Sequence, residues 1–123
     1  MVSVIIAGTR NFSDYPLMKE KLDRLRASIG VFEVVSGGAK GADFLGERYA
    51  NENELPLKIF PAEWDKYGKS AGYKRNEEMA QYAGACIAFW DGKSKGTEHM
   101  INLAKKHGID LSVVRYENRQ GLS

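Results

Sequence analysis

The fold follows from the stretch AGACIAFWDGKSKGT, residues 83–97. Its first part, Ala83–Trp90, is an apolar run that predicts a buried strand. Its second part is a small turn with Gly92 and Gly96, and it leads into a helix predicted over residues 95–107. Such a turn leaves backbone N–H groups free at the start of the helix, where the helix dipole also favours an anion. With the hydroxyls of Ser94 and Thr97 as further donors, the stretch predicts a site for a phosphate or a carboxylate.

Two more turns of this kind follow other predicted strands. The turn SGGAKGAD, residues 36–43, follows a strand predicted over 32–35, and Gly8-Thr9-Arg10 follows a strand predicted over 2–7. Three such turns after parallel strands form one rim, which is where open α/β sheets bind ligands. The candidate ligand-binding residues on this rim are Gly8, Thr9, Arg10, Gly37, Gly38, Ala39, Gly41, Asp43, Asn76, Gly92, Ser94, Gly96 and Thr97.

Strands and helices alternate along the whole chain. Besides the strands above, 57–60 and 111–116 are predicted strands, and helices are predicted to begin near Ser13 or Asp14 and to cover 41–53, 71–82 and 95–107. Residues 62–72 show no clean period and predict a loop with at most one helical turn. The alternation predicts an α/β fold, a three-layer Rossmann-like sandwich with a mostly parallel five-stranded sheet. We expect one nucleotide-binding domain over 1–117 and a polar tail over 118–123.

The composition narrows the class of protein. The chain has 123 residues, 43% of them hydrophobic, and a formal net charge of +2. This near-neutral charge argues against a nucleic-acid partner, which usually goes with a concentrated basic patch. Cys86 is the single cysteine and His99 and His107 stand apart, so we expect no disulfide, no metal site and a reducing, cytoplasmic location. No signal peptide and no membrane-spanning run is found.

Charged and aromatic side chains near the turns offer recognition chemistry. Arg10 and Arg75 carry planar forks of donors that suit phosphate, although each could also be a surface or salt-bridged cation. Asp43 either stabilises a helix start or accepts a hydrogen bond from a ribose hydroxyl or a base amine. Trp64, Tyr67 and Tyr73 either pack against the protein or stack on a base.

Several motifs taken together resemble the SLOG superfamily, in particular its YspA-like branch. They cover nearly the whole chain in order and comprise Gly8-Thr9-Arg10-Asn11-Phe12, residues 36–43, Phe60-Pro61-Ala62-Glu63-Trp64, residues 72–79 and residues 91–97. The resemblance implies a domain of bacteria or phages that binds a nucleotide or nucleotide-derived phosphorylated ligand at the rim, as a sensor, carrier or sequestering protein. It also allows a homo-oligomer. We expect a nucleotide-derived small molecule as the partner and no cofactor.

A more distant resemblance is to the LOG-type phosphoribohydrolases, whose signature is P-G-G-x-G-T-x-x-E. Residues 94–97 match its phosphate-binding part, and Arg75 corresponds to its arginine. Met100 stands where the signature has its glutamate, and a thioether cannot activate water or support an oxocarbenium ion. Asp91, Glu98 or Asp43 could supply the carboxylate instead. The resemblance thus leaves hydrolysis of a nucleotide or ADP-ribose-like ligand as a second hypothesis, with Arg75, Glu98 and Asp91 as candidate catalytic residues.

The third hypothesis is a module that binds single-stranded DNA. It comes from a distant resemblance to the DNA-processing Smf and DprA domains. The near-neutral charge places it behind binding of a small nucleotide ligand and behind hydrolysis.

Overall fold

The computed structural model describes residues 1–117, so the tail predicted over 118–123 lies outside the described residues. Its sheet is entirely parallel and has the strand order β3-β2-β1-β4-β5. The strands are β1 (Ser3–Gly8), β2 (Glu33–Ser36), β3 (Leu57–Ile59), β4 (Ala85–Trp90) and β5 (Asp110–Arg115). The predicted α/β class and the predicted five-stranded parallel sheet are thereby confirmed.

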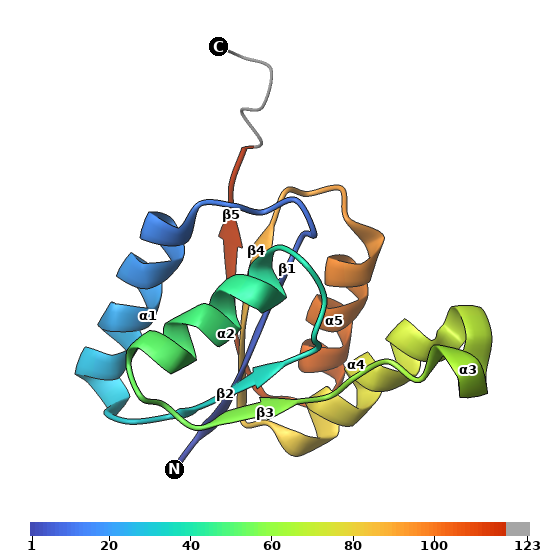
Figure 1. Cartoon of the computed structure of the whole chain (residues 1–123), viewed down its shortest axis with the longest axis horizontal. Helices are drawn as coiled ribbons and strands as arrows, with labels where there is room; N and C mark the ends of the chain where they lie inside the picture. Colours follow the sequence, from blue (N-terminus) through green and yellow to red (C-terminus); the bar gives the residue numbers. More distant parts are fainter. Residues whose placement is uncertain (118–123) are drawn as a thin grey trace.

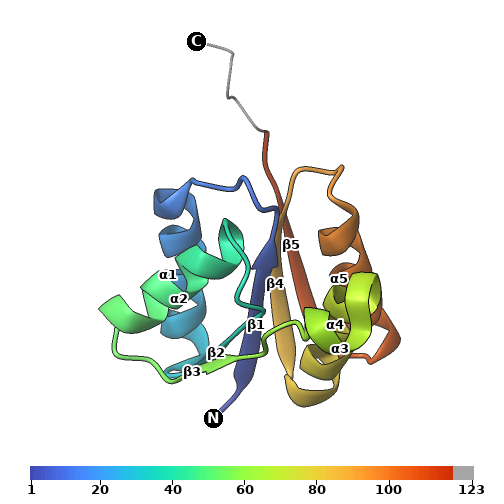
Figure 2. The ribbon, with the colours of Figure 1, turned by 45° about the vertical axis from the view of Figure 1, so that its right-hand side comes forward.

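Helices cover both faces of the sheet, and Figures 1 and 2 show the three layers. One layer holds α1 (Tyr15–Ile29) and α2 (Ala42–Glu52), and the other holds α4 (Ala71–Tyr82) and α5 (Lys95–Lys106). Side chains of β1 alternate between the two layers. Val4 and Ile6 belong to the core under α1 and α2, whereas Ile5 and Ala7 belong to the core under α4 and α5.

The start of α1 shows how local sequence sets an element. Asp14 is the N-cap, because its carboxylate accepts a hydrogen bond from the backbone N–H of Leu17 at 3.1 Å. Pro16 lies in the first turn, where its missing N–H costs no helical hydrogen bond. Gly30, with φ of +80°, ends the helix as its C-cap.

Residues 62–72 are more helical than their irregular pattern predicts. They contain the short helix α3 (Trp64–Tyr67), a 3₁₀ turn over Gly68–Ser70 and the start of α4. No residue of α3 is buried, so no apolar face was required and no helical period appears in the sequence. Figure 1 shows that α3 projects beyond the end of α4. Among residues 1–117, no helix has the length and apolarity needed to cross a membrane.

The strand order places a reversal beside β1. From β1 the chain moves outward to β2 and β3, and it then crosses back to β4 and β5 on the other side of β1. The loops that follow β1 and β4 therefore part from each other and open a crevice at the carboxyl ends of these two strands. This is the position at which open α/β sheets bind ligands.

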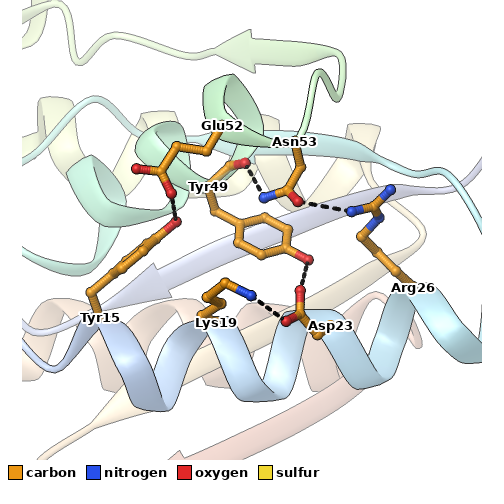
Figure 3. A network of polar contacts seen from close by, with 7 residues as sticks. All are labelled: Tyr15, Lys19, Asp23, Arg26, Tyr49, Glu52 and Asn53. Carbon is orange, nitrogen blue, oxygen red and sulfur yellow. Dashed lines mark hydrogen bonds and ion pairs between the residues drawn. The ribbon is translucent and has the colours of Figure 1, made fainter.

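A polar network ties α1 to α2, as Figure 3 shows. The buried ring of Tyr49 ends in a hydroxyl that donates to Asp23 at 2.6 Å, and Lys19 holds the other oxygen of this carboxylate at 2.7 Å. Tyr15 donates to Glu52 at 2.7 Å in the same way. These bonds fix α2, and with it the turn that leads into α2 from β2.

We predict that Tyr49→Phe lowers the free energy of unfolding by about 1 to 2 kcal/mol, because it removes a hydrogen bond to an ionised carboxylate from a buried ring. Urea unfolding followed by circular dichroism measures this change. The matched control is Tyr82→Phe, which removes a bond of similar length to Glu33 from an exposed ring. We expect a change within about 0.5 kcal/mol for this control. Equal losses in the two variants would contradict the assigned role of the network.

Candidate functional site

Two adjoining cavities lie at the carboxyl ends of the strands. The first has a volume of about 250 Å³ and the second of about 570 Å³. Both are lined by Arg10, Ala39, Trp64 and Arg75, so together they form one continuous groove. Of the predicted ligand-binding residues, the groove is lined by Gly8, Arg10, Gly37, Gly38, Ala39, Asp43, Asn76, Ser94, Gly96 and Thr97. Thr9, Gly41 and Gly92 belong to the same turns but line neither cavity.

The turn between β2 and α2 is built around the carboxylate of Asp43. This carboxylate accepts a hydrogen bond from the N–H of Ala39 at 3.3 Å, and the Ser36 hydroxyl accepts one from the N–H of Gly38 at 3.0 Å. Ser36 in turn donates to Glu47 at 2.6 Å. The carboxylate of Asp43 therefore occupies the place that the glycine turn would otherwise offer to a phosphate.

The buried carboxylate of Asp43 lowers the stability of the fold. Burial raises the pKa of its carboxyl to about 6, although the N–H of Ala39 and the charge of Arg75 both favour the ionised form. Only 7% of its surface is exposed. A carboxylate in this state destabilises the folded chain at neutral pH, and its presence in the wall of the first cavity points to a role other than stability.

Arg75 connects the α4 side of the groove to the turn after β2. Its guanidinium donates to the carbonyl oxygen of Gly37, and the approach is close. A Cβ atom on residue 37 would lie 2.7 Å from the Nη1 atom of Arg75 and 2.8 Å from a carboxylate oxygen of Asp43, so a side chain there would displace one or both of these groups. Burial lowers the pKa of Arg75, with Asp43 acting to raise it and Arg10 acting to lower it. Arg75 stays charged, because a guanidinium does not lose its proton in a protein. Arg10 and Arg75 both line the two cavities, so their charges act on the same part of the groove.

Asn76 has its side-chain amide engaged within the protein. Its oxygen accepts from the Nε of Arg75 at 3.0 Å, and its nitrogen lies 3.2 Å from the Nδ1 of His99. Only 7% of Asn76 is exposed. Sequence reasoning missed His99, because it lies 23 residues from Asn76 and nothing in the local pattern indicates that α4 and α5 bring the two together.

The turn after β4 is closed by Asp91. Its carboxylate accepts from the N–H groups of Lys93 at 2.8 Å and Ser94 at 2.9 Å. Desolvation opposes ionisation, but these N–H groups outweigh it and the pKa of Asp91 is lowered. Ser94 caps α5 by accepting from the N–H of Thr97 at 3.3 Å. Asp91 thus builds the turn, while the start of α5 faces the first cavity through Ser94, Gly96 and Thr97.

The candidate catalytic residues do not come together in the groove. Arg75 lines both cavities, whereas Asp91 and Glu98 line neither, and Glu98 is exposed on α5. Met100, at the position of the hydrolase glutamate, is buried and lines the first cavity. Within residues 1–117, no three side chains of histidine, cysteine, aspartate or glutamate gather into a possible metal site.

The aromatic candidates occupy different places. Trp64 lines both cavities with 53% of its surface exposed, so its ring is free to stack on a planar ligand. Tyr67 lines neither cavity and packs beneath the ammonium groups of Lys66 and Lys74. Tyr73 lines the first cavity instead. Its ring packs edge-on against the ring of His99, with 4.5 Å between the two ring centroids.

These features define a class: an open α/β domain with a polar, aromatic-bearing ligand groove at the reversal of its strand order. A model of the YspA, cpYpsA-related SLOG family matches residues 2–67. Gene 61 protein of Mycobacterium phage D29 is 40% identical over 120 residues, an alignment that covers 90% of this chain and 94% of the phage protein. The chain therefore belongs to the YspA, cpYpsA-related SLOG family.

A solved structure with the same fold corrects one expectation. DNA processing protein A from Helicobacter pylori, described for its single-stranded DNA binding mode, matches 94% of this chain and 66% of its own with a TM-score of 0.70. The two chains are 22% identical, so the likeness concerns the fold. The expectation of a small-molecule partner, with nucleic acid argued against by net charge, is wrong in the light of this match. A summed charge contains no information about where the cations lie.

We predict that Asp43→Asn raises the free energy of unfolding at pH 7 by up to about 3 kcal/mol, the equivalent of moving a carboxyl pKa from 3.8 to about 6. Because the folded-state pKa is raised, the native chain loses stability as pH rises through about 6. The variant should lack this loss, and urea unfolding from pH 4 to pH 8 measures it.

Asp23→Asn is the matched control for this prediction. The pKa of Asp23 is lowered by hydrogen bonds from Lys19 and Tyr49, so its carboxylate stabilises the fold above the unfolded pKa and this gain is lost in acid. We expect Asp23→Asn to lower stability at pH 7. A loss of stability in Asp43→Asn as well would contradict the cost assigned to Asp43.

Proposed function

We propose that the groove at the carboxyl ends of β1, β2 and β4 binds single-stranded DNA. The observation that carries the proposal is the exposed ring of Trp64, which lies between the two cavities and shares their walls with Arg10 and Arg75. An exposed aromatic ring beside cations is the usual platform for an unpaired base and its phosphates. Because the ring offers a face to any base, the proposed binding is tolerant of sequence.

The groove also has room and charge for more than one nucleotide. Lys40 lines the larger cavity and Lys69 the smaller one, and Arg10 and Arg75 line both. Phosphates in the strand would lie along these four cations. The start of α5, with the hydroxyl of Thr97, adds an anion-favouring helix end to the wall of the smaller cavity.

The comparisons support the proposal in two ways. Membership in a SLOG family fits binding of nucleotide-related ligands, and a protein of the same fold is described for binding single-stranded DNA. The site supports binding more than hydrolysis. Asp43 is the carboxylate in the smaller cavity, and the turn before α2 already uses it as a hydrogen-bond acceptor.

We predict that Trp64→Ala weakens binding of an oligonucleotide of about 20 nucleotides by roughly 1 to 3 kcal/mol, the range found for loss of one base–aromatic stack.

Arg10→Ala should weaken binding by at least about 1.5 kcal/mol, as for a charge-assisted hydrogen bond. It should also reduce the slope of log affinity against log salt by about 0.7, the value for a single strand when one phosphate is no longer neutralised. Fluorescence anisotropy over a salt series measures both effects.

The matched control is Arg24→Ala, which removes an exposed arginine from α1, paired with Glu20 and outside the groove. It should bind like the unaltered chain, and a duplex of the same sequence should bind more weakly than the single strand. Equal losses in Arg24→Ala and Arg10→Ala would indicate non-specific attraction. Absence of binding by the unaltered chain at low salt would overturn the proposal.

A further inference from the structure

Asn76 lies between Arg75 and His99, and the chemistry of its neighbours fixes how it is oriented. The Nε of Arg75 is always a donor, so the atom of Asn76 that faces it at 3.0 Å must be the amide oxygen. The amide nitrogen then faces the Nδ1 of His99 at 3.2 Å. Since that nitrogen donates, Nδ1 must accept. The contacts therefore require a neutral His99 with its proton on Nε2.

From this chain of hydrogen bonds we infer that His99 is a positioning residue for Arg75 and acts through the amide of Asn76. The inference rests on the proposed function, because it concerns the arginine that would hold the DNA phosphate. One end of the guanidinium is held by Asn76, and the Nη1 end is held by the carbonyl of Gly37. With both ends fixed, the guanidinium is held in the wall that Arg75 contributes to both cavities.

Protonation of His99 breaks this arrangement. A proton on Nδ1 would face the N–H₂ group of Asn76, so the amide would have to turn over. Its nitrogen would then confront the Nε–H of Arg75, and the guanidinium would lose one of its two anchors. DNA affinity should therefore fall in acid, as His99 becomes charged.

The groups around these hydrogen bonds set the pH range. Burial lowers the pKa of His99 below the ordinary value of 6.5, and Glu77 of α4 acts in the opposite direction. Tyr73 of α4 closes one side of the ring. The charges of Arg10 and Asp43 act on Arg75. Asp43 titrates near pH 6, and its protonation removes a negative charge beside Arg75, which strengthens phosphate binding. The two titrations have opposite signs, so variants are needed to separate them.

The test compares two substitutions of His99 in DNA binding at pH 5.5 and pH 7.5. His99→Gln keeps an acceptor for Asn76 and does not titrate, so it should bind within about twofold of the unaltered chain at pH 7.5 and lose less affinity in acid. His99→Leu keeps the bulk but offers no acceptor, so at pH 7.5 it should bind about tenfold more weakly than the unaltered chain, as for one hydrogen-bonding group left unpaired. This difference should shrink at pH 5.5, where protonation of His99 removes the acceptor from the unaltered chain as well. Circular dichroism checks that both fold.

The ring itself is observed by ¹⁵N NMR of the DNA-free chain. We expect the Nε2–H tautomer and a lowered pKa for His99, with His107 as the second histidine signal and His107→Gln for assignment. Asn76→Asp should raise the pKa of His99 above 6.5, because a carboxylate favours the charged ring.

The outcomes separate the two proposals. If the unaltered chain binds DNA and His99→Leu binds equally well with the same pH profile, the positioning role is overturned and the proposed function stands. If the unaltered chain fails to bind DNA, the proposed function falls. In that case the NMR result still decides the arrangement, because an Nδ1–H tautomer in the DNA-free chain would overturn it.

Discussion

The hydrogen bond from Arg75 to the carbonyl of Gly37 is the constraint on which the groove depends. It requires a half-buried cation, and it brings that cation within reach of both Asp43 and Arg10. It also requires glycine at position 37, because any side chain there would displace the guanidinium. The raised pKa of Asp43 is part of the same arrangement, since its carboxylate is buried while it organises the turn that presents the Gly37 carbonyl.

This bond also connects the two helical layers at the edge of the sheet. Asp43 belongs to α2 on one face, whereas Arg75 belongs to α4 on the other (Figures 1 and 2). The groove therefore has one wall from each layer, and α3 adds Trp64, which lines both cavities. On the α2 side, the bonds of Tyr49 and Tyr15 to α1 hold the wall in place (Figure 3). The network between α1 and α2 supports the site without touching it.

The sequence predicts the parts of this site that are encoded locally. Buried strands, glycine turns and the helix starts at Asp14 and Ser94 each follow from a few adjacent residues, so the fold and the position of the groove could be predicted. Contacts between distant elements could not. The pairing of Asn76 with His99 depends on how α4 packs on α5, and the choice of Tyr73 over Tyr67 for the cavity wall depends on the path of α3 and α4. The net charge led to the wrong expectation about a nucleic-acid partner for the same reason, because a summed charge does not tell where in the fold the cations lie.

The placement of the charges explains how a nearly neutral chain can present a cationic groove. Among residues 1–117, the lysine and arginine ion pairs join residues of α1 or of α2: Lys19 with Asp23, Arg24 with Glu20 and Arg48 with Glu52. These three pairs lie outside the groove, whose walls carry Arg10, Lys40, Lys69 and Arg75 against the two carboxylates of Asp43 and Glu47. Four cations there correspond to a salt slope of at most about −3 for a single strand. In the proposed binding mode, electrostatics of this size would guide a strand to the groove, and stacking on Trp64 would supply the larger share of its retention at physiological salt.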